Sequence, residues 1–368
     1  MSAPSPAPPQ PRWGRWLTIA GALALFCFTA LTVRDAGLSA VRPAEGGTFT
    51  GRDVDGRLVQ VCLFHQEGGW QGWLYREGRE QTEWFTTTNR AHPWREPVYF
   101  REPEEGPKPP APTVTSTSDP LRLNATLPRT NGWTSDTANL TRQFEHLSYR
   151  RLTGLRLGGW GGTKEFIARF PKLPASSRFH AAINREIIHQ SETSAVEFTA
   201  DPLEFWHENW ELRGPSVINT HAFTAHWQLR LLSTNLASFC VWSYDEVGGI
   251  GNRSRWQGVN FVRAPDGAHI MKLADLFLPA GDWPQQMRNR CAAKLRAISV
   301  RESIAETALE NDNNIENFTV SPTGLQIYFN PYEIATGADG EFVVHFDYTE
   351  LKDLLRTNGP AALLPHLP

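Results

Sequence analysis

Apolar and polar side chains alternate strictly from Phe223 to Leu231, and this pattern restricts the possible folds more than any other feature of the chain. The odd positions carry apolar residues, whereas the even positions carry Thr224, His226, Gln228 and Arg230. Successive side chains of a β-strand point to opposite faces, so the pattern predicts an antiparallel strand with one buried face and one face in water. A turn at Thr234-Asn235 leads into a second predicted strand, "LASFCVWSY".

Two helices are predicted on either side of this strand pair. Before it, the segment "SSRFHAAINREIIHQ" has apolar residues at every fourth position, and Ser176 or Ser177 supplies the N-cap oxygen. These apolar residues are Phe179, Ile183 and Ile187. After the strand pair, a second helix is predicted to begin at Asp282, because Pro284 fits the first turn of a helix.

The closing part of the chain, "GLQIYFNPYEIATGADGEFVVHFDYTELKDLL", predicts two strands and a helix, joined by a turn and a loop. Pro331 fixes its own φ angle and biases Asn330 toward extended conformations, so we expect Asn330, Pro331 and Tyr332 to form a structural turn. Asp347 and Glu350 are spaced as a capping box, which predicts the start of the last helix.

Short β-rich runs separated by glycine turns extend from Thr48 to Thr88 and predict a small antiparallel meander. The Pro-rich, polar stretch over residues 101–120 is typical of a linker. We therefore expect a β-rich module over residues 45–150, which contains this linker, followed by an α+β domain over residues 152–368. The predicted fold class is α+β, with an antiparallel sheet packed by two or three helices, because helices and strands occur in unequal blocks.

The apolar run "LTIAGALALFCFTALTV" (residues 17–33) carries no charge, and a helix of this length covers about 25 Å, close to the thickness of a membrane. Arg12 and Arg15 precede it. We therefore expect a Pro-rich cytoplasmic tail over residues 1–16, a transmembrane anchor, and the rest of the chain outside the cytoplasm. The alternative is a signal peptide cleaved after Leu38-Ser39-Ala40, which would give a secreted protein.

The sequence contains no Gly-x-Ser-x-Gly, His-Glu-x-x-His or Cys-x-x-Cys motif, and we expect no enzymatic activity, no cofactor and no metal. A net charge of −3 with mixed signs predicts no nucleic-acid partner. The spacing of His221 and His226 does not suit one metal ion, so both are predicted to be solvated. The acidic stretch from Asp201 to Glu211 leaves a hydrolase open, because glycoside hydrolysis needs paired carboxylates.

The stretch "YDEVGGIGNRSRWQG" (residues 244–258) is the best candidate binding surface in the sequence. Gly248 and Gly249 predict a turn, arginines offer bidentate donors, and aromatic rings stack on sugars and are frequent at interfaces. The predicted ligand-binding residues are Trp242, Tyr244, Arg253, Arg255 and Trp256. An ordinary hairpin connection is the alternative.

Four cysteines occur, at positions 27, 62, 240 and 291, and none has the spacing of metal ligands. In an oxidising compartment, Cys240 and Cys291 are the pair best suited to form one disulfide. Buried free thiols are the alternative.

The closing part of the chain resembles the RsiV-like C-terminal domain, a family of unknown biochemical function. The resemblance rests on "YFNPYEI" and on "KLADLF" (Lys272–Phe277), and Arg169–Ile187 is similar to the companion segment that precedes the domain. Members carry Gly-Gly-Ala-His where this chain has Gly248-Gly249-Ile250-Gly251, so no role of that histidine transfers. The resemblance implies an α+β fold and an extracytoplasmic recognition role, since members occur in lysozyme-responsive anti-sigma factors and beside peptidoglycan deacetylase domains.

Together these features predict a single-pass protein of the bacterial cytoplasmic membrane that binds a cell-envelope glycan or protein without catalysing a reaction. An anti-sigma-like regulator that senses envelope stress or lysozyme is one alternative, although residues 1–16 are short and Pro-rich for holding a sigma factor. A peptidoglycan hydrolase or deacetylase is the other.

Overall fold

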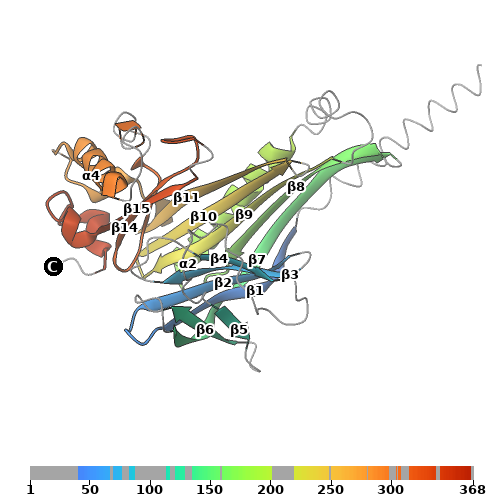
Figure 1. Ribbon diagram of the computed structural model, residues 1–368, viewed down its shortest axis with the longest axis horizontal. Helices are drawn as coiled ribbons and strands as arrows, with labels where there is room; N and C mark the ends of the chain where they lie inside the picture. The colour runs from blue at the N-terminus through green and yellow to red at the C-terminus, as the bar shows by residue number, and fades with distance from the viewer. Residues whose placement is uncertain are drawn as a thin grey trace, which may run out of the picture.

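The computed structural model of the chain shows an α+β fold, as predicted, in which helices pack against two β-sheets (Figure 1). The residues that the structure describes are 40–66, 69–76, 83–87, 113–116, 121–128, 135–157, 160–200, 219–247, 250–279, 281–297, 304, 306–307, 315–336 and 340–365.

A twelve-stranded sheet forms the larger part of the fold. Its strands are β1 (Ala40–Arg52), β2 (Leu58–Gln66), β3 (Gly69–Arg76), β4 (Glu83–Thr87), β5 (Thr113–Ser116), β6 (Arg122–Pro128), β7 (Ser135–Leu157), β8 (Trp160–Pro171), β9 (Asn219–Leu232), β10 (Leu236–Val247), β11 (Ile250–Ala264) and β12 (Gly267–Ile270). They follow the order β12-β11-β10-β9-β8-β7-β1-β2-β3-β4, and β6 with β5 branches from β7. Neighbouring strands are antiparallel except β8 and β9, which are parallel.

The sheet is continuous across the boundary that the sequence predicts near residue 150. Strand β7 runs through this position and pairs with β1 on one side and β8 on the other. The meander β2–β3–β4 and the long strands β8–β11 therefore belong to one sheet. Part of the predicted linker, residues 113–116, is strand β5 and pairs with β6.

Helix α2 (Arg178–Thr199) covers the apolar face of the long strands. The Ser177 hydroxyl accepts a hydrogen bond from the His180 N–H at 3.0 Å and caps the helix. The buried stripe of the helix includes the predicted residues Phe179, Ile183 and Ile187. These three share a core with Ala225, Trp227 and Leu229 of β9. The predicted N-cap and the predicted stripe are both confirmed.

The even-numbered face of β9 is also buried, so the prediction of a face in water was wrong. Thr224, His226, Gln228 and Arg230 are only 8%, 1%, 3% and 3% exposed. Strands β2 and β3 cover this face: Phe64 stacks on His226 at 4.0 Å, and the Arg230 guanidinium lies over the Tyr75 ring at 4.7 Å. The fold therefore contains a polar interior in addition to its apolar cores.

The C-terminal unit is a three-stranded antiparallel sheet packed by helix α4 (Trp283–Ala297), which begins where the sequence predicts it. The strands are β13 (Phe318–Val320), β14 (Gly324–Phe329) and β15 (Phe342–Asp347). Asp347 and Glu350 form the predicted capping box. It opens a 3-10 helix, η4 (Tyr348–Leu351), rather than an α-helix. Two further 3-10 helices are η1 (Leu273–Leu276) and η5 (Gly359–Leu363).

The small sheet lies directly against the large sheet at Gly258 of β11. A Cβ atom there would lie 1.7 Å from the carbonyl oxygen of Phe318, so only glycine permits this approach. Beside it, the Asn317 side chain accepts a hydrogen bond from the Gly258 N–H and donates one to the Trp256 carbonyl, both at 2.8 Å. Main-chain atoms of β11 thus fix the small sheet against the polar face.

Several predicted segments lie outside the described residues: the tail and anchor (residues 1–33), the Gly248-Gly249 turn and the acidic stretch from Asp201 to Glu211. Within the part of the chain that is described, no helix is both long enough and apolar enough to cross a membrane.

Candidate functional site

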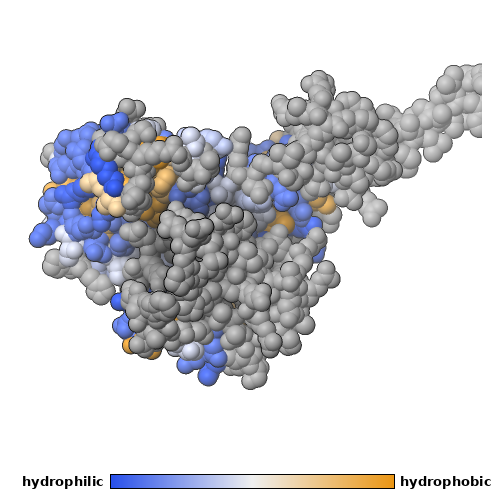
Figure 2. Space-filling model, in the orientation of Figure 1, coloured by the Kyte–Doolittle hydropathy of each residue, from blue (hydrophilic) through white to orange (hydrophobic). Residues whose placement is uncertain are grey.

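A pocket of about 560 Å³ lies between helix α4 and strand β15, and we name it the α4–β15 groove. Its lining residues are Arg290, Ala293, Lys294, Ala297, Val343, Val344, His345, Phe346 and Glu350. Figure 2 shows apolar surface between hydrophilic residues in the region where Figure 1 places α4 and β15. The groove therefore combines apolar side chains with charged ones.

Strand β15 borders the groove with one of its edges. Four consecutive residues, Val343 to Phe346, line the groove, although neighbouring side chains of a strand point to opposite faces. Because residues from both faces of β15 line the groove, the groove lies beside the edge of this strand. The other edge of β15 pairs with β14, and no further strand of the described chain pairs with β15. An unpaired strand edge presents main-chain N–H and C=O groups that can pair with another chain.

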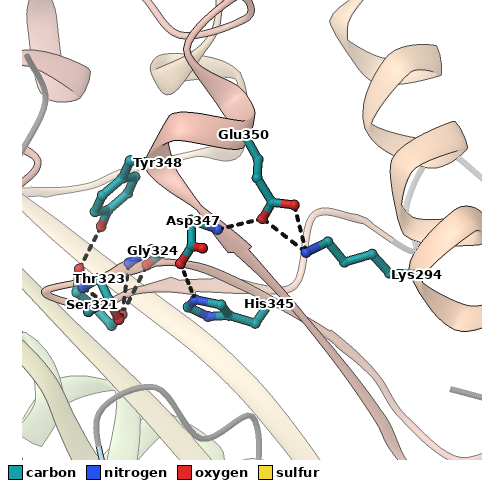
Figure 3. Close-up of polar contacts among 8 residues, drawn as sticks. All are labelled: Lys294, Ser321, Thr323, Gly324, His345, Asp347, Tyr348 and Glu350. Carbon is teal, nitrogen blue, oxygen red and sulfur yellow. Dashed lines mark hydrogen bonds and ion pairs between the residues drawn. The ribbon is translucent and has the colours of Figure 1, made fainter. Parts of the chain in front are cut away.

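A charged network crosses the groove from helix to sheet (Figure 3). The Lys294 ammonium group lies 2.9 Å from the Glu350 carboxylate. That carboxylate also accepts a hydrogen bond from the Asp347 N–H at 2.8 Å. Burial alone would raise the pKa of Glu350, but the hydrogen bonds from Lys294 and the Asp347 N–H outweigh it and hold the pKa below its usual value. Glu350 is therefore ionised at neutral pH.

Arg290 and His345, two further polar side chains of the groove, each lie beside an acidic residue. Arg290 pairs with Asp353 at 2.6 Å, and His345 Nε2 lies 3.2 Å from Asp347 Oδ1. The described lining contains no serine, threonine or cysteine that could act as a nucleophile. Across the described chain, no group of three His, Cys, Asp or Glu residues is placed to hold a metal ion.

Four stacked rings on the polar face form a second candidate surface, which we name the aromatic row. Phe64 stacks on His226, His226 on Trp242, and Trp242 on Tyr244. Their centroids are 4.0, 5.6 and 5.6 Å apart, with interplanar angles of 22°, 27° and 19°. The first two rings are buried, whereas Trp242 and Tyr244 are partly exposed. The outer end of the row therefore presents ring surface to solvent.

The five residues predicted to bind a ligand do not form one surface. Trp242, Tyr244 and Trp256 lie on the polar face, and Trp242 and Trp256 are cross-strand partners. Trp256 is only 7% exposed. Arg255 is exposed and points to the opposite face, because it precedes Trp256 in the same strand. The side chain of Arg253 lies outside the described residues. The expected loop is in fact a hairpin in which β10 and β11 pair closely.

Residues 274–349 match the family described as "Protein of unknown function (DUF3298)". The chain carries a DUF3298 domain. The match contains α4, the three-stranded sheet and every lining residue of the groove except Glu350. At the level of the family, it confirms the resemblance to the RsiV-like C-terminal domain.

Two solved structures of DUF3298 family members are similar to this chain. One, from Bacteroides fragilis NCTC 9343, shares 16% identity with a TM-score of 0.41, and the alignment covers 58% of this chain and 94% of that one. The other, from Pseudomonas aeruginosa PAO1, shares 14% identity with a TM-score of 0.39, and the alignment covers 60% and 97%. No curated protein matches the sequence.

The predicted turn of the DUF3298 domain follows strand β14. Asn330 is buried, and its N–H donates to the Glu333 carboxylate at 2.8 Å. Pro331 follows, and Tyr332 takes a φ of 70°, a left-handed conformation that is rare for a residue other than glycine. The Tyr332 side chain is 73% exposed, and its N–H donates to the Ala335 carbonyl at 3.1 Å.

The predicted disulfide between Cys240 and Cys291 is not formed, and the alternative of buried free thiols holds. Cys62, Cys240 and Cys291 are free and buried. Cys240 lies with Trp256 and other aromatic residues in the polar interior, whereas Cys291 of the DUF3298 domain lies in the core under α4. The two thiols thus belong to different cores. Burial raises the pKa of all three thiols, those of Cys62 and Cys291 to about 12.

The two histidines that the sequence predicts to be solvated differ from each other. His221 is half-buried, and its Nε2 atom lies 2.5 Å from Asp245 Oδ1. His226 is 1% exposed, so that prediction was wrong for His226. Burial, and next the charge of Arg169, lower the pKa of His226 well below its usual value.

Sequence reasoning missed the α4–β15 groove. One signal was present, since Arg290 and Lys294 are four residues apart and therefore share a face of the helix. The contact of that face with the edge of β15 depends on tertiary structure, which the spacing of residues does not show.

Proposed function

We propose that this protein is a non-enzymatic binding protein of the bacterial cell envelope. Its DUF3298 domain would hold an extended segment of a partner protein in the α4–β15 groove. The observation that supports this proposal is the lining of the groove by four consecutive residues of an edge strand, Val343 to Phe346.

An extended peptide suits this geometry because it can add a strand to an exposed sheet edge. Main-chain hydrogen bonds then supply affinity, and pockets for alternate side chains supply specificity. Ala293 and Ala297 of α4 are exposed and Val343 of β15 is partly exposed, so these side chains offer apolar contacts to such a segment. Both cations of the lining already have acidic partners, Lys294 in Glu350 and Arg290 in Asp353, so the segment needs no charge of its own to fit the groove.

The proposal places the protein in the cytoplasmic membrane as a single-pass protein, with its bulk outside the cytoplasm. The uncharged run over residues 17–33 and the resemblance to extracytoplasmic domains support this location. If that run is cleaved, the same binding domain is secreted.

Selection from a displayed library of random linear peptides tests the proposal. We expect the selected peptides to have apolar residues at alternate positions. They should bind Lys294→Glu about tenfold more weakly than the wild type, because the variant places a second carboxylate beside Glu350 and so disturbs the lining of the groove. Arg263→Glu changes an exposed arginine of β11 that does not line the groove and should bind as the wild type does. Equal binding to Lys294→Glu and the wild type would contradict a peptide site in the groove.

A glycan ligand on the aromatic row is the second candidate, because Trp242 and Tyr244 present stacked, partly exposed rings. Ring faces of this kind stack on sugars. Soluble peptidoglycan fragments should then bind the wild type and bind Tyr244→Ala more weakly, whereas Lys294→Glu should have no effect on their binding. If Lys294→Glu instead weakened the binding of these fragments and Tyr244→Ala did not, the result would favour the groove as the site that binds them.

A further inference from the structure

Arg169 of β8 is a buried cation that forms no ion pair within the described chain. Its side chain is 8% exposed, and its Nη1 atom is buried without a hydrogen-bond partner. Glu165, on the same strand, pairs with Arg150 at 2.5 Å. The Arg169 guanidinium lies 5.1 Å from the centre of the Phe64 ring, at the inner end of the aromatic row. A ring face offsets only part of the free energy needed to bury a charge.

Two buried histidines lie beside Arg169. His226 is its register partner across the β8–β9 pair, and both ring nitrogens of His226 are buried without a partner. His146 of β7 is 1% exposed. Its Nε2 atom lies 2.7 Å from Thr48 Oγ1, whereas its Nδ1 atom is buried without a partner.

Both histidines are neutral, because burial and the charge of Arg169 lower their pKa values, that of His146 to about 3. A neutral imidazole carries one N–H donor. The cluster therefore offers donors from Arg169 and from two rings, together with one uncompensated positive charge.

Water could satisfy these donors, but water would leave the charge of Arg169 unbalanced. Buried charges in proteins are paired, and a buried cation without a partner is strongly destabilising. An anion would accept hydrogen bonds from the guanidinium and from the rings while it neutralises the charge. It must be small, because Phe64 stacks on His226 at 4.0 Å and Cys62 Sγ lies 3.9 Å from His146 Nε2.

We propose that Arg169, His226 and His146 bind a small monovalent anion, of the size of chloride, inside the polar face of the large sheet. The site joins β7, β8 and β9 to the strands that cover them, since Thr48 belongs to β1 and Phe64 to β2. The anion stabilises the folded arrangement of these strands and takes no part in binding at the α4–β15 groove.

The test measures unfolding of the full chain while sodium chloride replaces sodium gluconate at constant ionic strength, so that screening stays the same. An anion that binds only the folded state lowers the unfolding equilibrium constant about tenfold for each tenfold rise in chloride above the dissociation constant. Arg169→Met removes the charge and keeps an apolar contact with Phe64, so it should abolish this dependence. Arg263→Met, at an exposed arginine of the same sheet, should keep it.

A second measurement covers the case in which Arg169→Met does not fold. Crystals of the wild-type protein grown with bromide should show an anomalous peak between Arg169 Nη1 and the ring of His226. Equal chloride dependence of the wild type and Arg169→Met would overturn the proposal. Wild-type crystals without a bromide peak at this position would overturn it too.

Discussion

Asn330 imitates a strand partner for Trp256. Its side-chain oxygen accepts a hydrogen bond from the Trp256 N–H at 2.6 Å, and its side-chain nitrogen donates to the Trp256 carbonyl at 3.1 Å. Asn330 belongs to the turn after β14, whereas Trp256 belongs to β11 of the large sheet. The Asn330 side chain thus forms hydrogen bonds with the main chain of a strand in the other sheet. These bonds join the DUF3298 domain to the polar face of the large sheet.

Asn330→Ala is expected to lower the free energy of unfolding by about 2 kcal/mol. The Trp256 N–H is buried by this contact and loses its acceptor, whereas the Trp256 carbonyl keeps the Asn317 side chain as a donor. Urea denaturation measures the change.

Asn289→Ala is the matched control, because Asn289 lies on the exposed side of α4. Its expected effect is within about 0.5 kcal/mol. Equal losses of stability in the two variants would show that Asn330 has no special part in joining the sheets.

Tyr332→Gly is expected to stabilise the protein by about 1 kcal/mol, because a φ of 70° is unfavourable for residues with a Cβ atom. Little packing is lost, since the Tyr332 side chain is 73% exposed. Tyr332→Ala removes the same ring but keeps the Cβ atom, so it should bring no gain. Thermal unfolding of both variants is the measurement, and equal midpoints for glycine and alanine would contradict backbone strain at this position.

The sequence predicted those elements of the fold whose causes are local. The Ser177 cap and the capping box of Asp347 and Glu350 depend on side chains that lie within three residues of each other. The buried stripe of α2 depends on the helical repeat. The prediction that the polar face of β9 lies in water was wrong. The residues that cover this face, such as Phe64 and Tyr75, come from strands far earlier in the chain.

The sequence did not show how the residues of the two candidate surfaces are arranged, for two different reasons. Arg255 and Trp256 were grouped as parts of one loop, but strand pairing continues to Val247 and Ile250, so neighbouring residues point to opposite faces. The α4–β15 groove combines Lys294 with residues of a strand that follows much later in the chain. No periodicity within either segment indicates that the two meet.

The three buried thiols are expected to resist alkylation in the native protein at neutral pH. Cys62, Cys240 and Cys291 are at most 5% exposed, and burial raises the pKa of each, so almost no reactive thiolate forms. Iodoacetamide treatment followed by peptide mass analysis should find all three unmodified in the native protein. After denaturation without a reductant, all three should be modified. If Cys240 and Cys291 instead stay unmodified until a reductant is added, the two residues form a disulfide.

Asp53 and Arg76 are expected to give the protein an acid-sensitive part of its stability. Arg76 donates to Asp53 from Nε at 2.8 Å, its Nη2 lies 2.7 Å from the same carboxylate, and both side chains are buried. Burial alone would raise the pKa of Asp53, but hydrogen bonds from the Arg57 and Asp55 N–H groups and from Arg76 hold it below its usual value. A carboxyl group with a lowered folded pKa stabilises the protein above its unfolded pKa, and this contribution is lost as the pH falls through the folded value.

Asp53→Asn should therefore cost about 3 kcal/mol at about pH 6, because it breaks a buried pair, and the difference from the wild type should shrink at about pH 3 and below. Urea denaturation across this pH range measures both quantities. Asp55→Asn changes a carboxylate whose side chain is 52% exposed, so its effect should stay within about 0.5 kcal/mol. Protonation of Asp53 is the step that removes the contribution of the pair. If the free energies of unfolding of Asp53→Asn and the wild type differ by the same amount from neutral to acid pH, the Asp53 carboxylate is not stabilised in the folded state.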